Sequence, residues 1–349
     1  MLRGAIIGLG NVALEGHLPG WRAREGVEIA AVTDVERGRR AEAAARIPAA
    51  RWFDTAEALL DHPGLDFVDI CTPPSSHAAL IEQALTRGLH VLCEKPLVRS
   101  LAELDVVSRL AAERGRVLHT VHNWHHAPLV RRTAELVRQD AIGRVSRVVW
   151  QTLRTRPAAT RDGQGVNWRL DPAISGGGIL TDHGWHVFYL VQRWLGARPV
   201  ALSAQLERRS LTTLPVEDTA TVRLTYPDAT AEILLTWAAD QRRNWARLEG
   251  AHGTLELQDD TLVLTRSARR EQWPCPPALS NGSVHSDWFA PVADRFVAEA
   301  TGAGTDDADN LGEAALCVLL ESLARESSRR GGETLPVPPV RAPVPAEPA

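Results

Sequence analysis

The most constraining feature of the sequence is a short apolar run that ends in a glycine turn. Residues 2–9 are typical of a buried strand, and residues 8–13 form a GxGxxA turn that opens a helical segment. In such a unit the first glycine makes the tight turn and the second lets a pyrophosphate approach the backbone. Free N–H groups at the helix start favour the phosphates. A plain strand–turn–helix would give the same pattern, but we predict cofactor contacts from Gly8, Gly10, Asn11 and Val12.

The second predicted strand, residues 27–33, ends at Asp34. An acidic residue at this point can bind both hydroxyls of an adenosine ribose, which favours NAD. Arg37, Arg39 and Arg40 lie just beyond and could instead hold the 2′-phosphate of NADP. A helix cap is the structural alternative for Asp34. We expect NAD as the cofactor, with NADP possible.

Strands and helices continue to alternate as far as His122, which predicts an α/β fold with a doubly wound parallel sheet. Two loops leave the carboxyl ends of its strands, where ligands bind in such sheets. The first is residues 72–77, and the second carries Glu94, Lys95 and Pro96. A lysine beside a cofactor can stabilise a developing alkoxide, although a surface loop lysine would look the same.

The rest of the chain predicts a second, α+β domain rich in antiparallel strands. Residues 145–153, 219–224 and 231–237 read as strands, 254–257 and 261–264 as a hairpin, and 288–300 and 311–325 as helices. Residues from 335 onward are rich in proline. We expect a dinucleotide domain over residues 1–122, a second domain over 123–332, and a flexible tail over 333–349.

Composition narrows the class of protein. A hydrophobic content of 44%, a charged content of 23% and a net charge of -4 are typical of a globular protein without a basic footprint for nucleic acid or membrane. The cysteines are scattered, with no CxxC spacing, which favours a reducing compartment. The apolar run at the N-terminus is too short for a signal peptide or a membrane span. We expect a cytoplasmic protein.

A third motif combines glycines with two groups that handle protons. Gly176-Gly177-Gly178 precedes Asp182 and His186, which would share one face if the segment is helical. A carboxylate beside an imidazole can hold the ring and stabilise its charged form. A glycine-rich turn that merely caps a helix is the alternative.

Together these motifs resemble the Gfo/Idh/MocA oxidoreductases, which include inositol and sugar dehydrogenases. The resemblance rests on the N-terminal Ile6-Ile7-Gly8-Leu9-Gly10 with His17-Leu18-Pro19, on Thr72-Pro73-Pro74 with His77, on Glu94-Lys95-Pro96, on residues 167–171, and on Gly176-Gly177-Gly178 with Asp182-x-Gly184-x-His186. Residues 217–220 and 250–255 are also similar, so the match covers about residues 2 to 332. Ser75 and His125-His126 depart from the family pattern.

The resemblance implies a second domain with a large open antiparallel sheet, whose exposed face forms homodimers or homotetramers. It implies that His186 is the base, that Lys95 stabilises the alkoxide, and that Asp182 binds a neighbouring hydroxyl and orients His186. It implies further cofactor contacts from Thr72, Pro73, His77, Glu94 and Lys95. The implied substrate-binding residues are Asn123, Trp168, Arg169, Asp182 and His186.

We therefore expect hydride transfer between nicotinamide and a secondary alcohol or ketone of a sugar, cyclitol or sugar-derived acid. Glycoside cleavage through transient oxidation and a non-catalytic NAD-binding regulator are the alternatives. Four arginines near Trp168 raise the possibility of an anionic group on the substrate: Arg154, Arg156, Arg161 and Arg169. Arg169 is the strongest candidate, and the others read as a solvated loop.

Clustered histidines raise the question of a metal site. The sequence places no cysteine or acidic residue beside them, and a functional site needs three convergent ligands. We expect no metal at this cluster, which consists of His119, His122, His125 and His126.

Overall fold

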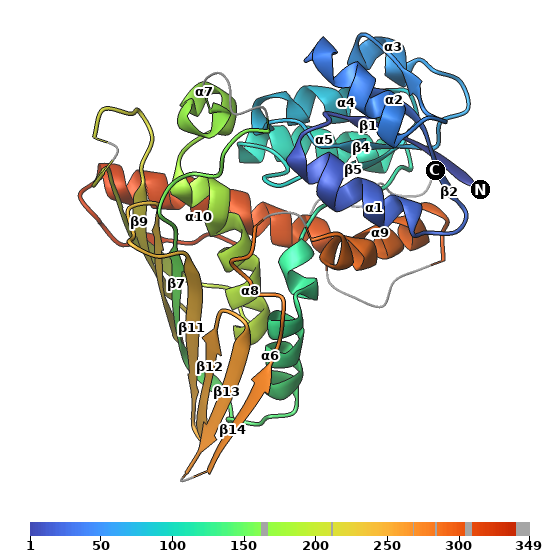
Figure 1. Ribbon diagram of the computed structural model, residues 1–349. Coiled ribbons are helices and arrows are strands. Elements are labelled where there is room, and N and C mark those ends of the chain that lie inside the picture. The colour runs from blue at the N-terminus through green and yellow to red at the C-terminus, as the bar shows by residue number, and fades with distance from the viewer. Residues whose placement is uncertain (162–166, 211, 268, 283–284, 304–308, 340–349) are drawn as a thin grey trace.

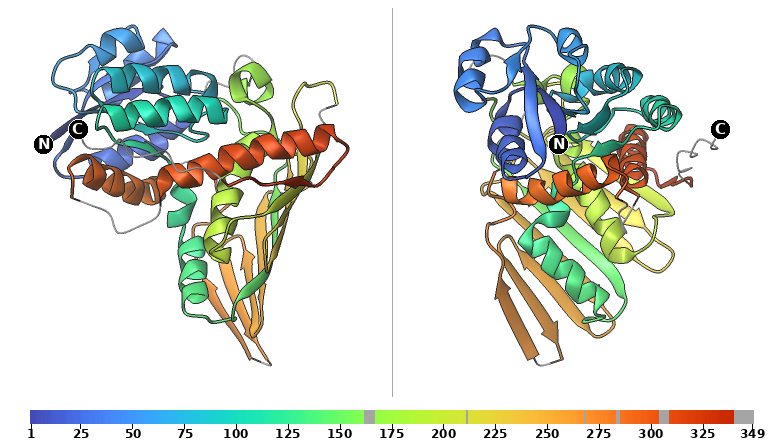
Figure 2. Two further views of the ribbon diagram at one scale, coloured as in Figure 1. Left: turned by 180° about the vertical axis from the view of Figure 1, so that it is seen from behind. Right: turned by 90° about the vertical axis from the view of Figure 1, so that its right-hand side faces the viewer.

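The protein is described by a computed structural model over residues 1–161, 167–210, 212–267, 269–282, 285–303 and 309–339. Figure 1 shows two units: a compact layered unit that holds the N-terminus, and a long sheet that extends away from it. The helix α10 (Asn310–Arg329) runs between them, as the left view of Figure 2 shows.

The N-terminal unit is a parallel sheet with strand order β3-β2-β1-β4-β5-β6. The order reverses between β1 and β4, and ligands bind at the carboxyl ends of the strands beside such a switch point. Its strands are β1 (Leu2–Ile7), β2 (Val27–Thr33), β3 (Arg51–Trp52), β4 (Phe67–Ile70), β5 (His90–Cys93) and β6 (Leu118–Thr120). Its helical segments are η1 (Val12–His17), α1 (Leu18–Arg22), η2 (Arg37–Arg39), α2 (Arg40–Arg46), α3 (Ala56–Leu60), η3 (Pro74–Ser76), α4 (His77–Thr86) and α5 (Leu101–Glu113).

Every residue of β4 is buried, because helices cover both faces of a parallel sheet. On one face Val68 and Ile70 share a core with Ile81 and Leu85 of α4. On the other face Phe67 belongs to a separate core that includes Trp21 of α1. The sheet therefore separates two apolar layers.

That second layer is completed by a helix from the far end of the chain, α9 (Ser286–Ala300). Phe289 stacks on His17 at 3.8 Å between ring centroids. Phe296 makes edge contacts with Trp21 and Phe67. Figure 1 shows α9 directly beneath α1. A segment near the C-terminus thus supplies part of the core of the N-terminal unit.

The second unit is a mixed sheet with strand order β14-β13-β12-β11-β7-β10-β9-β8-β15, in which β7 and β10 are parallel and the other pairs antiparallel. Its strands are β7 (Val145–Leu153), β8 (Ala201–Glu207), β9 (Thr219–Thr225), β10 (Thr230–Thr236), β11 (Arg243–Gly250), β12 (Gly253–Gln258), β13 (Thr261–Arg266), β14 (Arg269–Pro274) and β15 (Leu335–Pro336). The remaining helical segments are η4 (Asn123–His126), α6 (Pro128–Arg138), η5 (Trp168–Leu170), α7 (Pro172–Ser175), η6 (Leu180–Gly184) and α8 (Trp185–Leu195).

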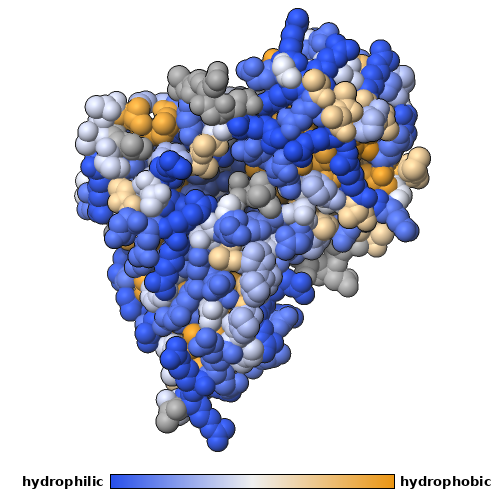
Figure 3. All heavy atoms as spheres, in the orientation of Figure 1, coloured by the Kyte–Doolittle hydropathy of each residue, from blue (hydrophilic) through white to orange (hydrophobic). Residues whose placement is uncertain are grey.

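Burial alternates along the central strands β7, β10 and β11, so one face of this sheet is apolar and the other is not. Helices α6, α8 and α10 lie on the apolar face (Figure 1). The opposite face carries charged pairs, among them Arg147 with Glu232 and Arg223 with Glu232. In the view of Figure 3 this part of the surface is mainly hydrophilic.

The start of the expected flexible tail differs from the prediction. Leu335 and Pro336 pair with Leu202 and Ala201 at the edge of the sheet, and the N–H of Val337 donates to Val200. An exposed sheet edge offers unpaired backbone groups, which explains why the chain adds a strand there despite its prolines. Residues 340–349 lie outside the described residues.

If α9 is part of the N-terminal core, Phe296→Ala should lower the free energy of unfolding by about 3–5 kcal/mol. Phe296 is fully buried, and its removal leaves a cavity beside Trp21 and Phe67. Urea unfolding followed by tryptophan fluorescence measures the loss. The control Val106→Ala, at a side chain 43% exposed on α5, should change stability by less than about 0.5 kcal/mol. Equal effects would contradict this role of α9.

Candidate active site

The glycine turn after β1 has the geometry expected for phosphate binding. Gly8 has φ of 90°, and a Cβ there would lie 3.0 Å from the backbone of Cys71. At Gly10 a Cβ would meet no described atom within 4 Å, so the turn is open on the side where a pyrophosphate would approach. The chain then enters η1 and α1. The residues present fit a dinucleotide.

Asp34 ties this turn to the end of β2. Its carboxylate accepts the N–H of Leu9 at 2.6 Å and the N–H of Glu36 at 2.8 Å, and it pairs with Arg39 at 2.8 Å. Glu36, not Asp34, occupies the N-cap position of the helical turn that follows, so the helix-cap interpretation of Asp34 is wrong. A carboxylate offers about four acceptor positions, and these three contacts leave room for a ribose hydroxyl.

His17 is a buried link beneath the loop that carries Lys95. Nδ1 lies 2.9 Å from Asp69, and Nε2 lies 3.1 Å from Glu94. Burial alone would lower the pKa of His17, but Asp69 reverses this and holds it well above its ordinary value. Both ring nitrogens therefore donate. The second oxygen of Glu94 accepts the N–H of Lys95 at 2.9 Å, so His17 fixes the start of that loop.

His77 links the two loops and does not line the cleft. Its ring nitrogens lie 2.8 Å from the carbonyl oxygens of Thr72 and Pro96. The side chain is fully buried, and burial lowers its pKa although both carbonyls act to raise it. The peptide between Lys95 and Pro96 is cis. We interpret His77 as a residue that positions both loops.

Lys95 reaches across to the second unit. Nζ donates to the carbonyl oxygen of Asp182 at 2.7 Å and lies 3.6 Å from its carboxylate. Arg169 lies 3.5 Å and His183 lies 3.6 Å from the same carboxylate. Burial alone would raise the pKa of Asp182, but these three groups and Arg154 lower it well below its usual range. Asp182 is therefore ionised among cations.

His186 has a different partner from the one the sequence suggested. Its ring stacks on Trp124 at 4.3 Å, and Nδ1 lies 2.9 Å from the hydroxyl of Tyr189. The expectation that Asp182 orients His186 is wrong. Asp182 instead contacts Lys95, Arg169 and His183, and among the described residues no hydrogen bond joins it to His186.

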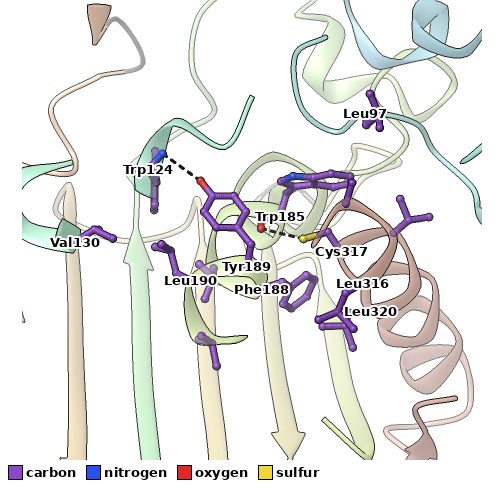
Figure 4. Close-up of a cluster of buried hydrophobic side chains, with 14 of the residues drawn as sticks. Leu97, Trp124, Val130, Trp185, Phe188, Tyr189, Leu190, Leu316, Cys317 and Leu320 are labelled. Carbon is purple, nitrogen blue, oxygen red and sulfur yellow. Dashed lines mark hydrogen bonds between the residues drawn. The ribbon is translucent and has the colours of Figure 1, made fainter. Parts of the chain in front are cut away.

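The protonation of His186 follows from its surroundings. Burial, then Lys95 and His183, lower its pKa well below the ordinary value, so the ring is neutral at neutral pH. Nε2 makes no hydrogen bond to any residue that the structure describes. The Tyr189 hydroxyl also accepts the N–H of Trp124 at 3.2 Å, which Figure 4 shows.

The glycines before Asp182 serve to pack protein against protein. A Cβ at Gly178 would overlap the backbone carbonyl of Glu217, and a Cβ at Gly177 would overlap Arg325. The N–H of Gly178 donates to the Glu217 carboxylate at 2.9 Å, and Arg325 pairs with that carboxylate at 3.2 Å. These glycines therefore allow a close approach to Glu217 and Arg325, and Gly177 and Gly178 also line the cleft.

One cleft of about 580 Å³ brings most of the predicted residues together. It is lined by all of the proposed catalytic and substrate-binding residues and by half of the proposed cofactor residues: Lys95, Asp182, His186, Asn123, Trp168, Arg169, Asn11, Val12, Thr72 and Glu94. The other cofactor residues do not line it: Gly8, Gly10, Asp34, Pro73 and His77. Sequence reasoning placed Arg154 in a solvated loop, but it is 2% exposed in the wall of the cleft. It did not select several other residues beside the cleft: His183, Tyr189, Trp237, Arg242 and His285.

The arginines near Trp168 separate into different roles. Arg169 lies over the Trp168 ring at 4.2 Å, and both line the cleft. Arg161 instead binds Glu15 and Glu42 of the N-terminal unit and donates to Asn11 at 3.1 Å. Arg156 is exposed at the cleft, and Arg154 is buried in its wall. Residues 162–166 of this segment lie outside the described residues.

The histidine cluster has acidic partners from distant helices, which the sequence did not reveal. His122 and His125 lie 3.0 and 3.1 Å from Glu313 of α10, and His119 lies 2.9 Å from Glu299 of α9. Nε2 of His122 accepts the indole hydrogen of Trp185 at 2.9 Å. A neutral imidazole has one free lone pair, so Nδ1 carries the hydrogen that Glu313 accepts. These hydrogen bonds connect His122 and the adjacent η4 to α10.

Among the described residues, no helix is both long and apolar enough to cross a membrane.

Comparison with protein families gives two matches. Residues 2–122 match a family described as the oxidoreductase family with an NAD-binding Rossmann fold, and residues 130–256 match the GFO/IDH/MocA C-terminal domain.

The curated relatives include several dehydrogenases. D-apiose dehydrogenase of Paraburkholderia graminis is 30% identical over 297 residues, or 81% of this chain and 75% of that protein. D-xylose 1-dehydrogenase (NADP(+)) 2 of Haloferax volcanii is 31% identical over 55% of this chain and 56% of that protein. Among solved structures, an oxidoreductase from Agrobacterium radiobacter in complex with NAD+, L-tartaric acid and magnesium has the same fold, with a TM-score of 0.84 and 22% identity over 96% of this chain and 98% of that one.

The raised pKa of His17 predicts a loss of stability at alkaline pH. A raised folded-state pKa adds stability that is fully present below the unfolded value of about 6.5 and is lost as pH rises through the folded value. At pH 6 His17→Gln should therefore cost about 3–5 kcal/mol, because Asp69 and Glu94 lose their shared partner.

The difference between wild type and His17→Gln in urea unfolding should shrink as pH rises toward 10. His252→Gln, an exposed histidine, serves as the control with no such trend. A difference that stays constant from pH 6 to 10 would show that His17 is neutral in the folded protein.

Proposed function

This chain belongs to the Gfo/Idh/MocA family of oxidoreductases, whose N-terminal domain binds NAD, and we propose that it oxidises a secondary alcohol of a sugar or sugar derivative, or reduces the corresponding ketone. The observation that carries the proposal is that Lys95, Asp182 and His186 line one cleft together with Asn11 and Thr72 of the cofactor loops. The dehydrogenase relatives support the same reaction class.

Residues of the N-terminal unit would hold the cofactor. The turn at Gly8 and Gly10 would receive the pyrophosphate, and Asp34 the adenosine ribose, for which the contacts above leave an acceptor position. Nicotinamide, when bound, supplies a hydride acceptor at C4. A preference for NAD over NADP remains a prediction. Arg39, which could hold a 2′-phosphate, pairs with Asp34.

The protein's own task is to handle the hydroxyl proton and the charge on the oxygen. His186 is neutral, and its free Nε2 can accept the proton of the reacting hydroxyl. Lys95 has hydrogens beyond the one it gives to Asp182, and these can stabilise the developing alkoxide. Asp182 is ionised and can accept a hydrogen bond from a neighbouring hydroxyl.

Tyr189 acts through His186. For Nε2 to be the acceptor, Nδ1 must carry the hydrogen and donate it to the Tyr189 oxygen at 2.9 Å. The same oxygen is fixed by the N–H of Trp124, and burial raises the pKa of Tyr189, so the hydroxyl stays neutral. We assign Tyr189 as a positioning residue that selects the tautomer of the base.

The first test replaces the base. His186→Ala should lower kcat about 10²–10⁴-fold, because a positioned general base contributes this much. NAD binding, followed by quenching of tryptophan fluorescence, should remain near that of wild type. Formation of reduced cofactor by absorbance, with sugars, cyclitols and uronates as substrates, provides the rate. Unchanged turnover, or loss of NAD binding, would refute the assignment.

The second test concerns Tyr189. Tyr189→Phe removes only the hydroxyl, so kcat should fall about 10-fold, consistent with the loss of one hydrogen bond of about 1.5 kcal/mol. The acid limb of the pH–rate profile should move to lower pH, because the imidazolium loses an acceptor for its Nδ1 hydrogen. A merely structural role for Tyr189 would lower stability and leave the position of that limb unchanged. Tyr226→Phe, at a buried tyrosine outside the cleft, is the matched control.

A further inference from the structure

Three central strands of the second sheet each have one end beside the cleft. Arg154 follows β7, Trp237 follows β10, and Arg242 precedes β11. Strands β7 and β10 are parallel, and β11 is antiparallel to β7. The three residues therefore lie at the same end of these strands. All three line the cleft. Their position is set by strand register.

Arg154 is a buried cation without a direct counter-charge. It is 2% exposed, and its guanidinium donates to the carbonyls of Leu153 and Arg243 at 2.8 and 3.2 Å and to Asn244 at 3.3 Å. Its Nε has no hydrogen-bond partner, and it forms no ion pair with any carboxylate in the described part of the chain. Burial and the neighbouring Arg242 lower the pKa of Arg154 to about 10. Two positive charges therefore stand close together here.

The other two groups of the wall are also donors. Arg242 gives its Nε hydrogen to the carbonyl of Ser280 at 2.5 Å and pairs with no carboxylate among the described residues. Trp237 is 2% exposed, and its indole N–H has no acceptor within the described ranges. An indole nitrogen and a guanidinium can only donate hydrogen bonds. The wall is therefore complementary to a group that only accepts them.

Asp259 holds this wall from behind. Its carboxylate accepts the N–H of Asn244 at 3.1 Å, and the N–H and hydroxyl of Ser280 at 2.9 and 2.6 Å. Asn244 and Ser280 are the residues that bind Arg154 and Arg242, so Asp259 fixes both arginines through them. Together with Lys95 and Arg169, these arginines place four cations against the carboxylates of Asp182 and Asp259, and this excess of positive charge favours an anionic group on the substrate.

We propose that Arg154, Arg242 and Trp237 form a carboxylate subsite, and that the substrate is a sugar acid whose carboxylate binds there while its reacting carbinol lies at Lys95 and His186. The proposal rests on the proposed function. Arg154 acts electrostatically on both Asp182 and His186, so the subsite and the proton-handling groups share one cleft. The alternative is that Arg154 only holds strands β7 and β11 together. In that case replacement of the exposed Arg242 would not change the choice of substrate.

The test compares acids with their neutral parents on the full-length protein loaded with NAD. D-glucuronate and D-galacturonate should be used with kcat/KM about 10–100-fold higher than D-glucose and D-galactose, as expected for a charged hydrogen-bonded group. Glucose 6-phosphate should not match the acids. Equal or better use of the neutral sugars, or a preference for the phosphate, would overturn the proposal.

Variants locate the effect. Arg242→Gln should lower kcat/KM for the acids about 10–100-fold and leave the neutral sugars unchanged, and Arg242→Lys should retain part of the preference. Arg144→Gln, an exposed arginine at the opposite end of β7, is the control. Arg154→Gln should lower kcat/KM for the acids more than for the neutral sugars, whose rates it also alters because Arg154 acts on Asp182 and His186. Arg242→Gln keeps the test valid if that buried variant does not fold.

Binding separates this proposal from the proposed function. In thermal unfolding of the NAD-loaded protein, the acids should raise Tm more than their neutral parents, and Arg242→Gln should abolish the difference. If no sugar reduces NAD but this difference is seen, the proposed function fails and the carboxylate subsite stands. If sugars are oxidised but acids give no larger shift, the subsite fails alone.

Discussion

The contact between Lys95 and Asp182 is the interaction on which the site depends. Lys95 lies in a loop of the parallel sheet, Asp182 lies in a turn of the other unit, and the ammonium group binds both the carbonyl and the carboxylate of that turn. Both side chains are mostly buried, so the charges gain from each other only while the two units keep their relative position. The proton-handling groups are therefore assembled by tertiary structure.

Much of the fold and part of the site can be predicted from local sequence. Gly8 and Gly10 mark a turn by their own backbone requirements, and Lys95 and His186 lie in short motifs with a defined spacing. Tyr189 also lies at helical spacing from His186, but an aromatic residue in an apolar run reads as core. The role of its hydroxyl depends on the contact with the N–H of Trp124, which the sequence does not reveal.

Other features depend on contacts that no local pattern contains. Arg154 and Arg242 are 88 positions apart and meet only because β7 and β11 pair in a particular register. The acidic partners of His119 and His122 come from α9 and α10, about 180 and 190 positions away. The partner of Asp182 is Lys95, 87 positions earlier in the chain, so the spacing of Asp182 and His186 suggested a contact that the described residues do not make.

The packing of α9 against α1 has a consequence for how the protein is made. The dinucleotide motif ends near His122, yet one apolar layer of its sheet lacks Phe289 and Phe296 until nearly 300 residues have been synthesised. A nascent chain that has emerged only as far as His122 would expose Trp21 and Phe67 to solvent and to chaperones. A fragment cut near His122 would therefore lack part of its own core and expose apolar surface that the whole chain covers.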